Sequence, residues 1–240
     1  MSTAKPLRTA VAPASAFPFF TSTIGRKVIM AVTGVILVGF VMGHMAGNLQ
    51  IFMGSAAPEA LKTYAEFLQH FGHGLGIWVA RITLMAAVIL HSWAAWTLTL
   101  ESWKARPIPY QKWTATESTI ASRTMRWSGP ALGLFVVYHI LHFTVGSVHG
   151  SFVQGDVYNN VVRGFQVWPV SAVYILAMLF LGLHLYHGVW SMLQTLGLSH
   201  PQYDPLRRVA SAVFAGLVVV GNCSMPIAVL AGLLRPVVAP

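Results

Sequence analysis

The sequence has very little cysteine and very little charge. Its 240 residues include a single cysteine, Cys223, and only 9% of them are charged. One cysteine excludes an intrachain disulfide, a cysteine-ligated iron-sulfur cluster and a C-x-x-C-H site that would attach haem covalently. Ordinary soluble domains contain about 25% charged residues. A soluble globular fold is therefore excluded, because too few charges are available to solvate its surface.

Nucleotide-binding motifs are absent as well. The sequence contains no glycine-rich phosphate loop and no dinucleotide-binding fingerprint. The polar stretch at residues 106–127 contains no constellation of acid, base and nucleophile. The chain therefore has no dehydrogenase chemistry of its own.

Long apolar runs dominate what is present, and 55% of the residues are hydrophobic. A helix needs about 20 mostly apolar residues to cross a bilayer. The sequence therefore predicts an all-α integral membrane bundle of five transmembrane helices in one domain, residues 26–240. Residues 1–25, with three prolines, are expected to form a loose cytoplasmic tail rather than a signal peptide. The five runs are residues 28–52, 76–100, 128–148, 167–196 and 209–234.

The net charge of +9 indicates topology rather than nucleic-acid binding. Eleven of the fifteen Lys and Arg residues lie before the first run, between the second and third runs, or between the fourth and fifth. These segments share one side of the membrane, and such basic segments stay in the cytoplasm. The N-terminus is therefore expected in the cytoplasm and the C-terminus outside, in the inner membrane of the cell, with membrane lipid and no nucleic acid as a partner.

Histidines are the chemically informative residues of the runs. An ionisable side chain inside a membrane is costly unless it faces protein, water or a ligand. One such histidine alone could be a packed residue bonded to a carbonyl. Four helices that each present at least one are better explained by pairs of axial ligands for haem iron inside a bundle. The intramembrane histidines are His44, His91, His139, His142, His184 and His187.

Depth in the membrane predicts how these histidines pair. With a rise of about 1.5 Å per residue, His44 lies outward of the middle of its run and His91 inward of the middle of its own. His44 should therefore pair with a histidine of the third run and His91 with one of the fourth, which predicts two stacked haems. Depth slightly favours His142 over His139 as the outer ligand, and the choice in the fourth run stays open. The spacings of 47 residues from His44 to His91 and 45 from His139 to His184 indicate a duplicated helical hairpin.

Two stretches accompany the single histidines of the first two runs: RWSGPALGLFVVYH at residues 126–139 and HLYHGVWS at residues 184–191. Together these features resemble the dihaem cytochrome b558 subunit of succinate dehydrogenases and fumarate reductases. The resemblance implies that the first histidine of each of the two stretches binds iron, and that His142 and His187 are neighbours of the ligands. The implied axial pairs are His44 with His139 for an outer haem b, and His91 with His184 for an inner haem b.

The resemblance also implies partner subunits on the cytoplasmic side. A flavoprotein with FAD would carry the succinate and fumarate chemistry, and an iron-sulfur subunit would exchange electrons with the inner haem. The chain would be the membrane anchor of a succinate:quinone oxidoreductase and would pass electrons between the iron-sulfur subunit and a quinone, menaquinone or ubiquinone. Dimers or trimers of these heterotrimers are expected in the family.

Further polar residues have two interpretations each. Arg126 and Arg81 could contact haem propionates, or could be a topology anchor and a snorkelling side chain. Between the first two runs, near the outer haem layer, the segment with Glu66, His70 and His73 could exchange protons with a quinone, or could be a solvated interfacial helix. Asn48 or Gln50, which follow His44 in the sequence, could donate a hydrogen bond to a quinone carbonyl.

Two other functions are compatible with the residues alone. One is the cytochrome b subunit of another quinone-linked enzyme, such as a nitrate reductase, hydrogenase or formate dehydrogenase. Respiratory bc-type cytochromes place two ligands on each of two helices, however, whereas here four helices contribute one layer each. The other is a transporter with a histidine relay for protons or metal ions. A haem absorption spectrum would distinguish the transporter, which should show no b-type bands.

Overall fold

The computed structural model describes residues 18–105 and 119–237, and all regular structure in these parts of the chain is helical. The predicted all-α class is therefore confirmed. Five helical segments of 26 to 30 residues are long and apolar enough to cross a membrane, in agreement with the five predicted runs. Their main helices are α2 (Thr23–Asn48), α4 (Leu75–Lys104), α5 (Ile120–His139), α7 (Trp168–Thr195) and α8 (Asp204–Leu230).

Polar first turns place the start of two segments eight residues earlier than predicted, and the first segment begins five residues earlier, at Thr23. α5 begins at Ile120 rather than at residue 128, because Thr119 Oγ1 accepts a hydrogen bond of 3.1 Å from the Ser122 N–H and caps the helix. The fifth segment begins with the turn η4 (Pro201–Tyr203) rather than at residue 209, and ends at Leu230 rather than at residue 234. Hydropathy does not reveal these ends, because the added turns contain polar and basic residues.

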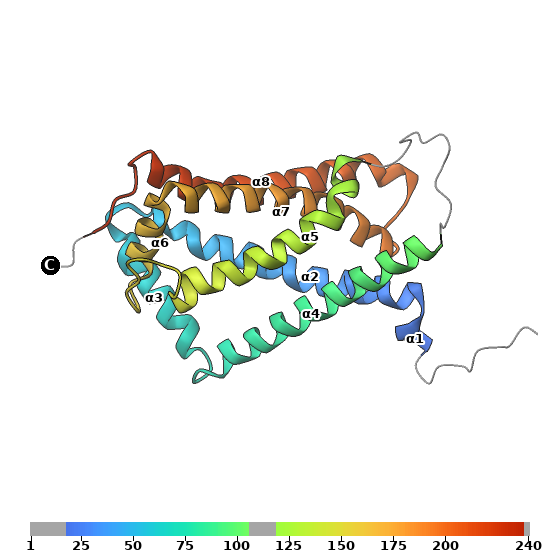
Figure 1. Ribbon diagram of the computed structural model, residues 1–240, viewed down its shortest axis with the longest axis horizontal. Helices are drawn as coiled ribbons and strands as arrows, with labels where there is room; N and C mark the ends of the chain where they lie inside the picture. The colour runs from blue at the N-terminus through green and yellow to red at the C-terminus, as the bar shows by residue number, and fades with distance from the viewer. Residues whose placement is uncertain (1–17, 106–118, 238–240) are drawn as a thin grey trace, which may run out of the picture.

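The five long helices run back and forth along one axis (Figure 1). α2 packs along α4, α5 along α7, and α7 along α8, while α2 also meets α7. At Gly182 the α7–α8 contact is close, since a Cβ there would lie 2.5 Å from Val219. This order of neighbours places α2 diagonal to α5 and α4 diagonal to α7.

Two short helices close one end of the bundle, which we call the capped end (Figure 1). α3 (Ala57–His70) follows the turns η1 (Leu49–Phe52) and η2 (Gly54–Ala56), and α6 (Val157–Gln166) precedes α7. α3 lies in the segment between the first two runs for which an interfacial helix was one interpretation, whereas α6 was not predicted. A core that includes Ile51, Leu61 and Val162, all at most 3% exposed, joins these elements. The capped end is therefore a packed part of the fold.

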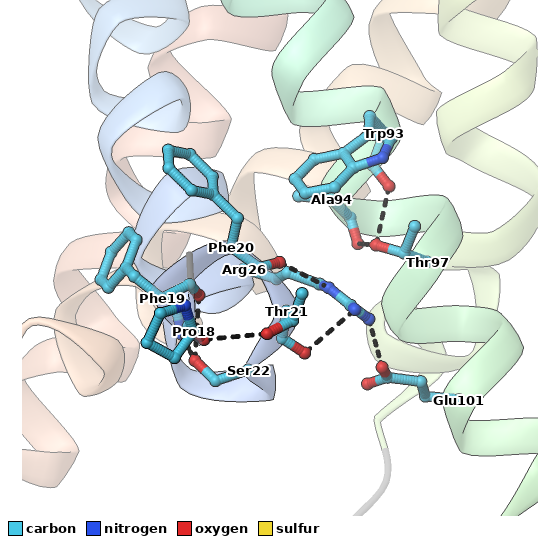
Figure 2. Close-up of polar contacts among 11 residues, drawn as sticks. Pro18, Phe19, Phe20, Thr21, Ser22, Arg26, Trp93, Ala94, Thr97 and Glu101 are labelled. Carbon is cyan, nitrogen blue, oxygen red and sulfur yellow. Dashed lines mark hydrogen bonds and ion pairs between the residues drawn. The ribbon is translucent and has the colours of Figure 1, made fainter. Parts of the chain in front are cut away.

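The opposite end holds α1 (Pro18–Thr21) (Figures 1 and 2). We call it the basic end because the helix ends there carry most of the Lys and Arg residues that the structure describes. Residues 18–25, assigned by sequence to a loose tail, form α1 and the start of α2, while residues 1–17 lie outside the described part. Arg26 forms an ion pair with Glu101 of α4 and donates to the carbonyls of Phe20 at 3.1 Å and Thr21 at 3.0 Å. One guanidinium therefore fastens α1 and α4 to α2.

Large apolar side chains cover the outside of the bundle. Ile82, Leu134 and Val220 are 66%, 75% and 69% exposed. Water would not tolerate a surface of this kind over the whole length of five helices, whereas lipid does. The chain is a multi-pass membrane protein.

Candidate functional site

Two pairs of histidines face each other across the diagonals of the bundle. The ring centroids of His44 on α2 and His139 on α5 are 5.7 Å apart, and those of His91 on α4 and His184 on α7 are 6.3 Å apart. We call them the outer pair and the inner pair. The outer pair lies toward the capped end and the inner pair toward the basic end. The structure thus brings together the same two pairs that the resemblance implied.

The separation of the rings in each pair suits one metal ion between two imidazoles. A metal–imidazole nitrogen bond is about 2 Å long, so two imidazoles on opposite sides of one ion have ring centroids about 6 Å apart. Both observed distances are close to this value. The donor set, two neutral nitrogen ligands from facing helices, is one that suits haem iron.

Three helices give the same distance between the two layers. On α2, Thr33 contacts the inner pair and His44 belongs to the outer pair, eleven residues later. On α5, Ser128 contacts the inner pair and His139 lies eleven residues later. The helical rise makes each separation about 16 Å. On α7, the ten residues from Tyr174, which contacts His139, to His184 give about 15 Å.

A hydrogen bond to a carbonyl fixes the tautomer of His91 in the inner pair. His91 Nδ1 lies 3.2 Å from the Met30 carbonyl oxygen and 3.2 Å from Thr33 Oγ1. A carbonyl can only accept, so Nδ1 carries the proton and the Nε2 lone pair is left for a metal ion. His184 Nδ1 lies 3.4 Å from Ser128 Oγ, which is fully buried. Both inner histidines therefore have an oxygen acceptor for Nδ1 on a neighbouring helix.

Thr33 and Ser128 show that the two halves of the bundle use the same arrangement. Each hydroxyl residue lies three turns before an outer-pair histidine on nearly the same helix face, and each contacts the inner-pair histidine of the next long helix. Sequence reasoning missed both residues, although the shared spacing of eleven was there to be found. The repeat supports the predicted duplication of a helical hairpin.

The outer pair has different partners. His139 Nδ1 lies 3.3 Å from the hydroxyl oxygen of Tyr174, which is also 3.0 Å from Nδ1 of His142. His44 Nε2 accepts a hydrogen bond of 3.1 Å from the Asn48 side-chain amide. A metal ion at that nitrogen would replace the bond to Asn48. Tyr174 is a site residue that sequence reasoning missed, since a tyrosine in an apolar run carries no signal by itself.

The rings of His142 and His187 do not face a histidine of another long helix. His142 lies in the π-helical turn η3 (Ile140–Val145) and is 2% exposed. Its ring stacks on Tyr138 at 5.4 Å and on His149 at 4.8 Å. The ring of His187 lies 6.1 Å from that of Trp190. The structure therefore places His139, rather than the depth-favoured His142, against His44.

Arg81 and Arg126 lie at the surface over tryptophan rings. The Arg81 guanidinium is 5.2 Å from the Trp78 ring, and that of Arg126 is 5.6 Å from the Trp103 ring. Arg126 also donates to Ser102 Oγ at 3.3 Å, which links α5 to α4 at the basic end. These contacts fit cation–π anchors at the ends of membrane helices.

The residues considered for a quinone are only partly brought together. Glu66, His70 and His73 are exposed, and His70 Nδ1 donates to the Glu66 carbonyl at 2.8 Å. Gln50 instead lines an open groove of about 560 Å³ at the capped end. This groove, which we call the outer groove, is lined by Gln50, Ala56, Glu59, Ala60, Thr63, Tyr64 and Phe67.

Fold and site together define a class: a five-helix membrane protein whose helices present two layers of facing histidines. Residues 109–222 match the family described as the succinate dehydrogenase/fumarate reductase transmembrane subunit. The match covers 114 of the 240 residues and supports the resemblance to a membrane anchor subunit of these enzymes. The match includes His139 and His184, while His44 and His91 lie before it. Searches among curated proteins and among solved structures found no match.

Proposed function

We propose that the chain is the dihaem membrane anchor of a succinate:quinone oxidoreductase, which passes electrons between an iron-sulfur subunit and a quinone. Two facing pairs of imidazoles, with ring centroids 5.7 Å and 6.3 Å apart, are the observation that carries the proposal. The family match over residues 109–222 supports it. The outer pair would hold one haem b and the inner pair the other. Haem b supplies a centre that takes up and releases one electron.

The residues around the pairs have supporting tasks. Thr33, Met30 and Ser128 accept the Nδ1 protons of the inner pair, which orients each ring and raises its basicity toward a metal ion. Tyr174 does the same for His139. The Asn48 side-chain amide donates to His44 Nε2 from the same helix, and a metal ion at this nitrogen would replace that bond. These contacts hold imidazoles in place inside a bundle that lipid surrounds.

The proposed orientation puts the basic end in the cytoplasm, where Lys and Arg side chains accumulate. The iron-sulfur subunit and the flavoprotein with FAD would bind there, at the end of the bundle that lies nearer to the inner pair. The quinone would bind near the outer pair at the capped end, at the outer groove. Arg81 and Arg126, whose guanidinium groups lie over the rings of Trp78 and Trp103, would be the contacts of haem propionates.

Purification of the membrane complex tests this function. We expect a flavoprotein and an iron-sulfur subunit to copurify with the chain, the complex to reduce quinone with succinate, and the spectrum to show b-type bands from two haems per chain. A histidine-relay transporter would show no haem bands. A complex with haem but with molybdenum or nickel subunits in place of the flavoprotein would indicate one of the other quinone-linked enzymes.

Tyr174→Phe is expected to raise the midpoint potential of one haem. The hydroxyl accepts the His139 Nδ1 proton, and its loss makes the imidazole a weaker donor, which destabilises ferric iron. A hydrogen bond of about 1 kcal/mol corresponds to about 40 mV for one electron. Redox titration of the α-band measures the shift.

Tyr138→Phe is the matched control for Tyr174→Phe. The Tyr138 ring stacks on His142, so its replacement removes a hydroxyl from the same neighbourhood without removing the acceptor of His139. Equal shifts in the two variants, or a shift of both haems in Tyr174→Phe, would contradict the assigned hydrogen bond.

A further inference from the structure

A cluster of buried hydrogen-bond donors without partners lies between α7 and α8 near the basic end. It consists of Trp190, Arg207 and Ser211, and we call it the donor cluster. Arg207 is 8% exposed and Ser211 is 0% exposed. Trp190 Nε1, Arg207 Nε and Nη1, and Ser211 Oγ are all buried and have no hydrogen-bond partner among residues 18–105 and 119–237. Buried polar atoms in native proteins are rarely left in this state.

The three side chains are neighbours. The Arg207 guanidinium carbon lies 5.9 Å from the centre of the Trp190 ring. Ser211 follows Arg207 by four residues on α8, so the two share a helix face. Four unpartnered atoms, three of them N–H groups and one a hydroxyl, thus belong to one small region.

The charges around the cluster do not balance. Arg207 and Arg208 both pair with the single carboxylate of Asp204, Arg208 at 3.4 Å. Arg208 is about half exposed, with 49% of its side chain accessible, whereas Arg207 is buried. A buried guanidinium is stable only when it is paired and its donors are satisfied. One carboxylate shared by two guanidinium groups leaves one positive charge in excess.

We propose that the donor cluster binds one anionic oxygen group, a carboxylate or a phosphate. Such a group supplies the missing negative charge and several acceptor lone pairs, and the guanidinium fork can hold it through two parallel bonds. The indole N–H and the serine hydroxyl complete the set of donors. A neutral carbonyl would accept hydrogen bonds but would leave the excess charge in place.

The position of the cluster allows two sources for this anion. Trp190 follows His184 on α7 by six residues, about 9 Å along the helix, so a carboxylate of a haem at the inner pair is one source, and this source rests on the proposed function. Arg207 lies in the first turn of α8 at the basic end, so the phosphate of a phospholipid is the other.

Arg207→Gln and Arg208→Gln in the purified membrane complex form a matched pair of variants. Each removes one positive charge next to Asp204 and Trp190, but only the first removes the buried unpartnered donors. In the first arm, each complex is reconstituted into phosphatidylcholine vesicles that contain phosphatidylglycerol, extracted again, and assayed by mass spectrometry for phosphatidylglycerol retained per chain. If the anion is a phosphate, Arg207→Gln should retain about tenfold less than the parent, the effect of one lost charge-assisted hydrogen bond, and Arg208→Gln should match the parent.

The second arm measures the midpoint potentials of the haems in the same complexes. If the anion is a haem carboxylate, Arg207→Gln should lower the potential of the inner haem, since an unneutralised carboxylate favours ferric iron, and Arg208→Gln should shift it much less. Equal behaviour of the two variants in both arms would overturn the proposal. If the Arg207→Gln complex does not assemble, Ser211→Ala and Trp190→Phe test the proposal instead. Each removes one donor, so each should give a smaller loss of retained phosphatidylglycerol or a smaller shift of the inner haem potential than is expected for Arg207→Gln. A complex without haem would refute the proposed function, and the lipid arm would still test the cluster.

Discussion

Replacement of His44 or His139 by alanine is expected to remove the same haem, the outer one. Their rings are 5.7 Å apart on diagonal helices, so each would supply one of two ligands to a single iron. Replacement of His91 or His184 should remove the inner haem, because these rings are 6.3 Å apart in the other layer. Redox titration of the α-band should resolve two components in the parent and one surviving component in each variant.

His142→Ala and His187→Ala are the controls for this series. They are also histidines, three positions after His139 and His184 in the same membrane-spanning segments, yet their rings face Tyr138, His149 and Trp190 instead of a histidine on another long helix. Both variants should keep two haems. Loss of a component in a control together with its retention in the His139 or His184 variant would reverse the choice of ligand in that helix. Loss of the same component in the His44 and His91 variants would refute the two-layer arrangement.

The sequence predicted the helices and the histidine layers because both depend on local signals. Apolar runs longer than about 20 residues have one stable solution in a bilayer, and the rise per residue converts the position of a histidine into depth. Helix ends were less predictable. α5 starts at Ile120 because of a Thr119 cap, and such a cap adds a polar turn that hydropathy assigns to a loop.

The choice between His139 and His142 could not be made from depth. The two residues differ in depth by only about 4.5 Å, and the π-helical turn η3 (Ile140–Val145) alters the direction in which His142 leaves the helix. His142 instead belongs to a buried group in which His149 Nε2 donates to the Asn160 carbonyl at 2.8 Å. Asn160 lies on α6, a helix that sequence reasoning missed because ten residues between two membrane spans give little hydropathy signal.

The sequence alone could not predict the contacts that orient the inner pair, and it could not predict the donor cluster. Thr33 and Ser128 matter because a histidine of another helix lies beside each of them, and such a contact depends on helix packing. Arg207 is a basic residue near the end of an apolar run, where an arginine ordinarily indicates topology. Only its burial and its unpartnered nitrogens distinguish it from Arg208.

Gln50→Leu is expected to reduce quinone reduction, because Gln50 lines the outer groove, where we propose that the quinone binds. Gln50 follows His44 by six residues, about 9 Å along the chain axis, and lines the groove with Glu59 and Tyr64. α3 lies directly on α2 there, since a Cβ at Gly47 would be 2.4 Å from the Tyr64 ring. The groove has a size typical of small-molecule sites and mostly apolar walls with a few polar groups.

Gln50→Leu should therefore reduce succinate:quinone reductase activity about tenfold, the effect of a lost hydrogen bond to a quinone carbonyl together with an unpaired acceptor. Both haems should stay bound, and succinate oxidation with an artificial acceptor should be unchanged, because the residue lies outside the histidine pairs. Glu66→Gln, His70→Ala and His73→Ala test the exposed residues near the groove, which could exchange protons with the quinone; each should lower the activity less than Gln50→Leu does. Full activity in Gln50→Leu with a large loss in one of these three would move the quinone site out of the groove and onto the exposed face of α3.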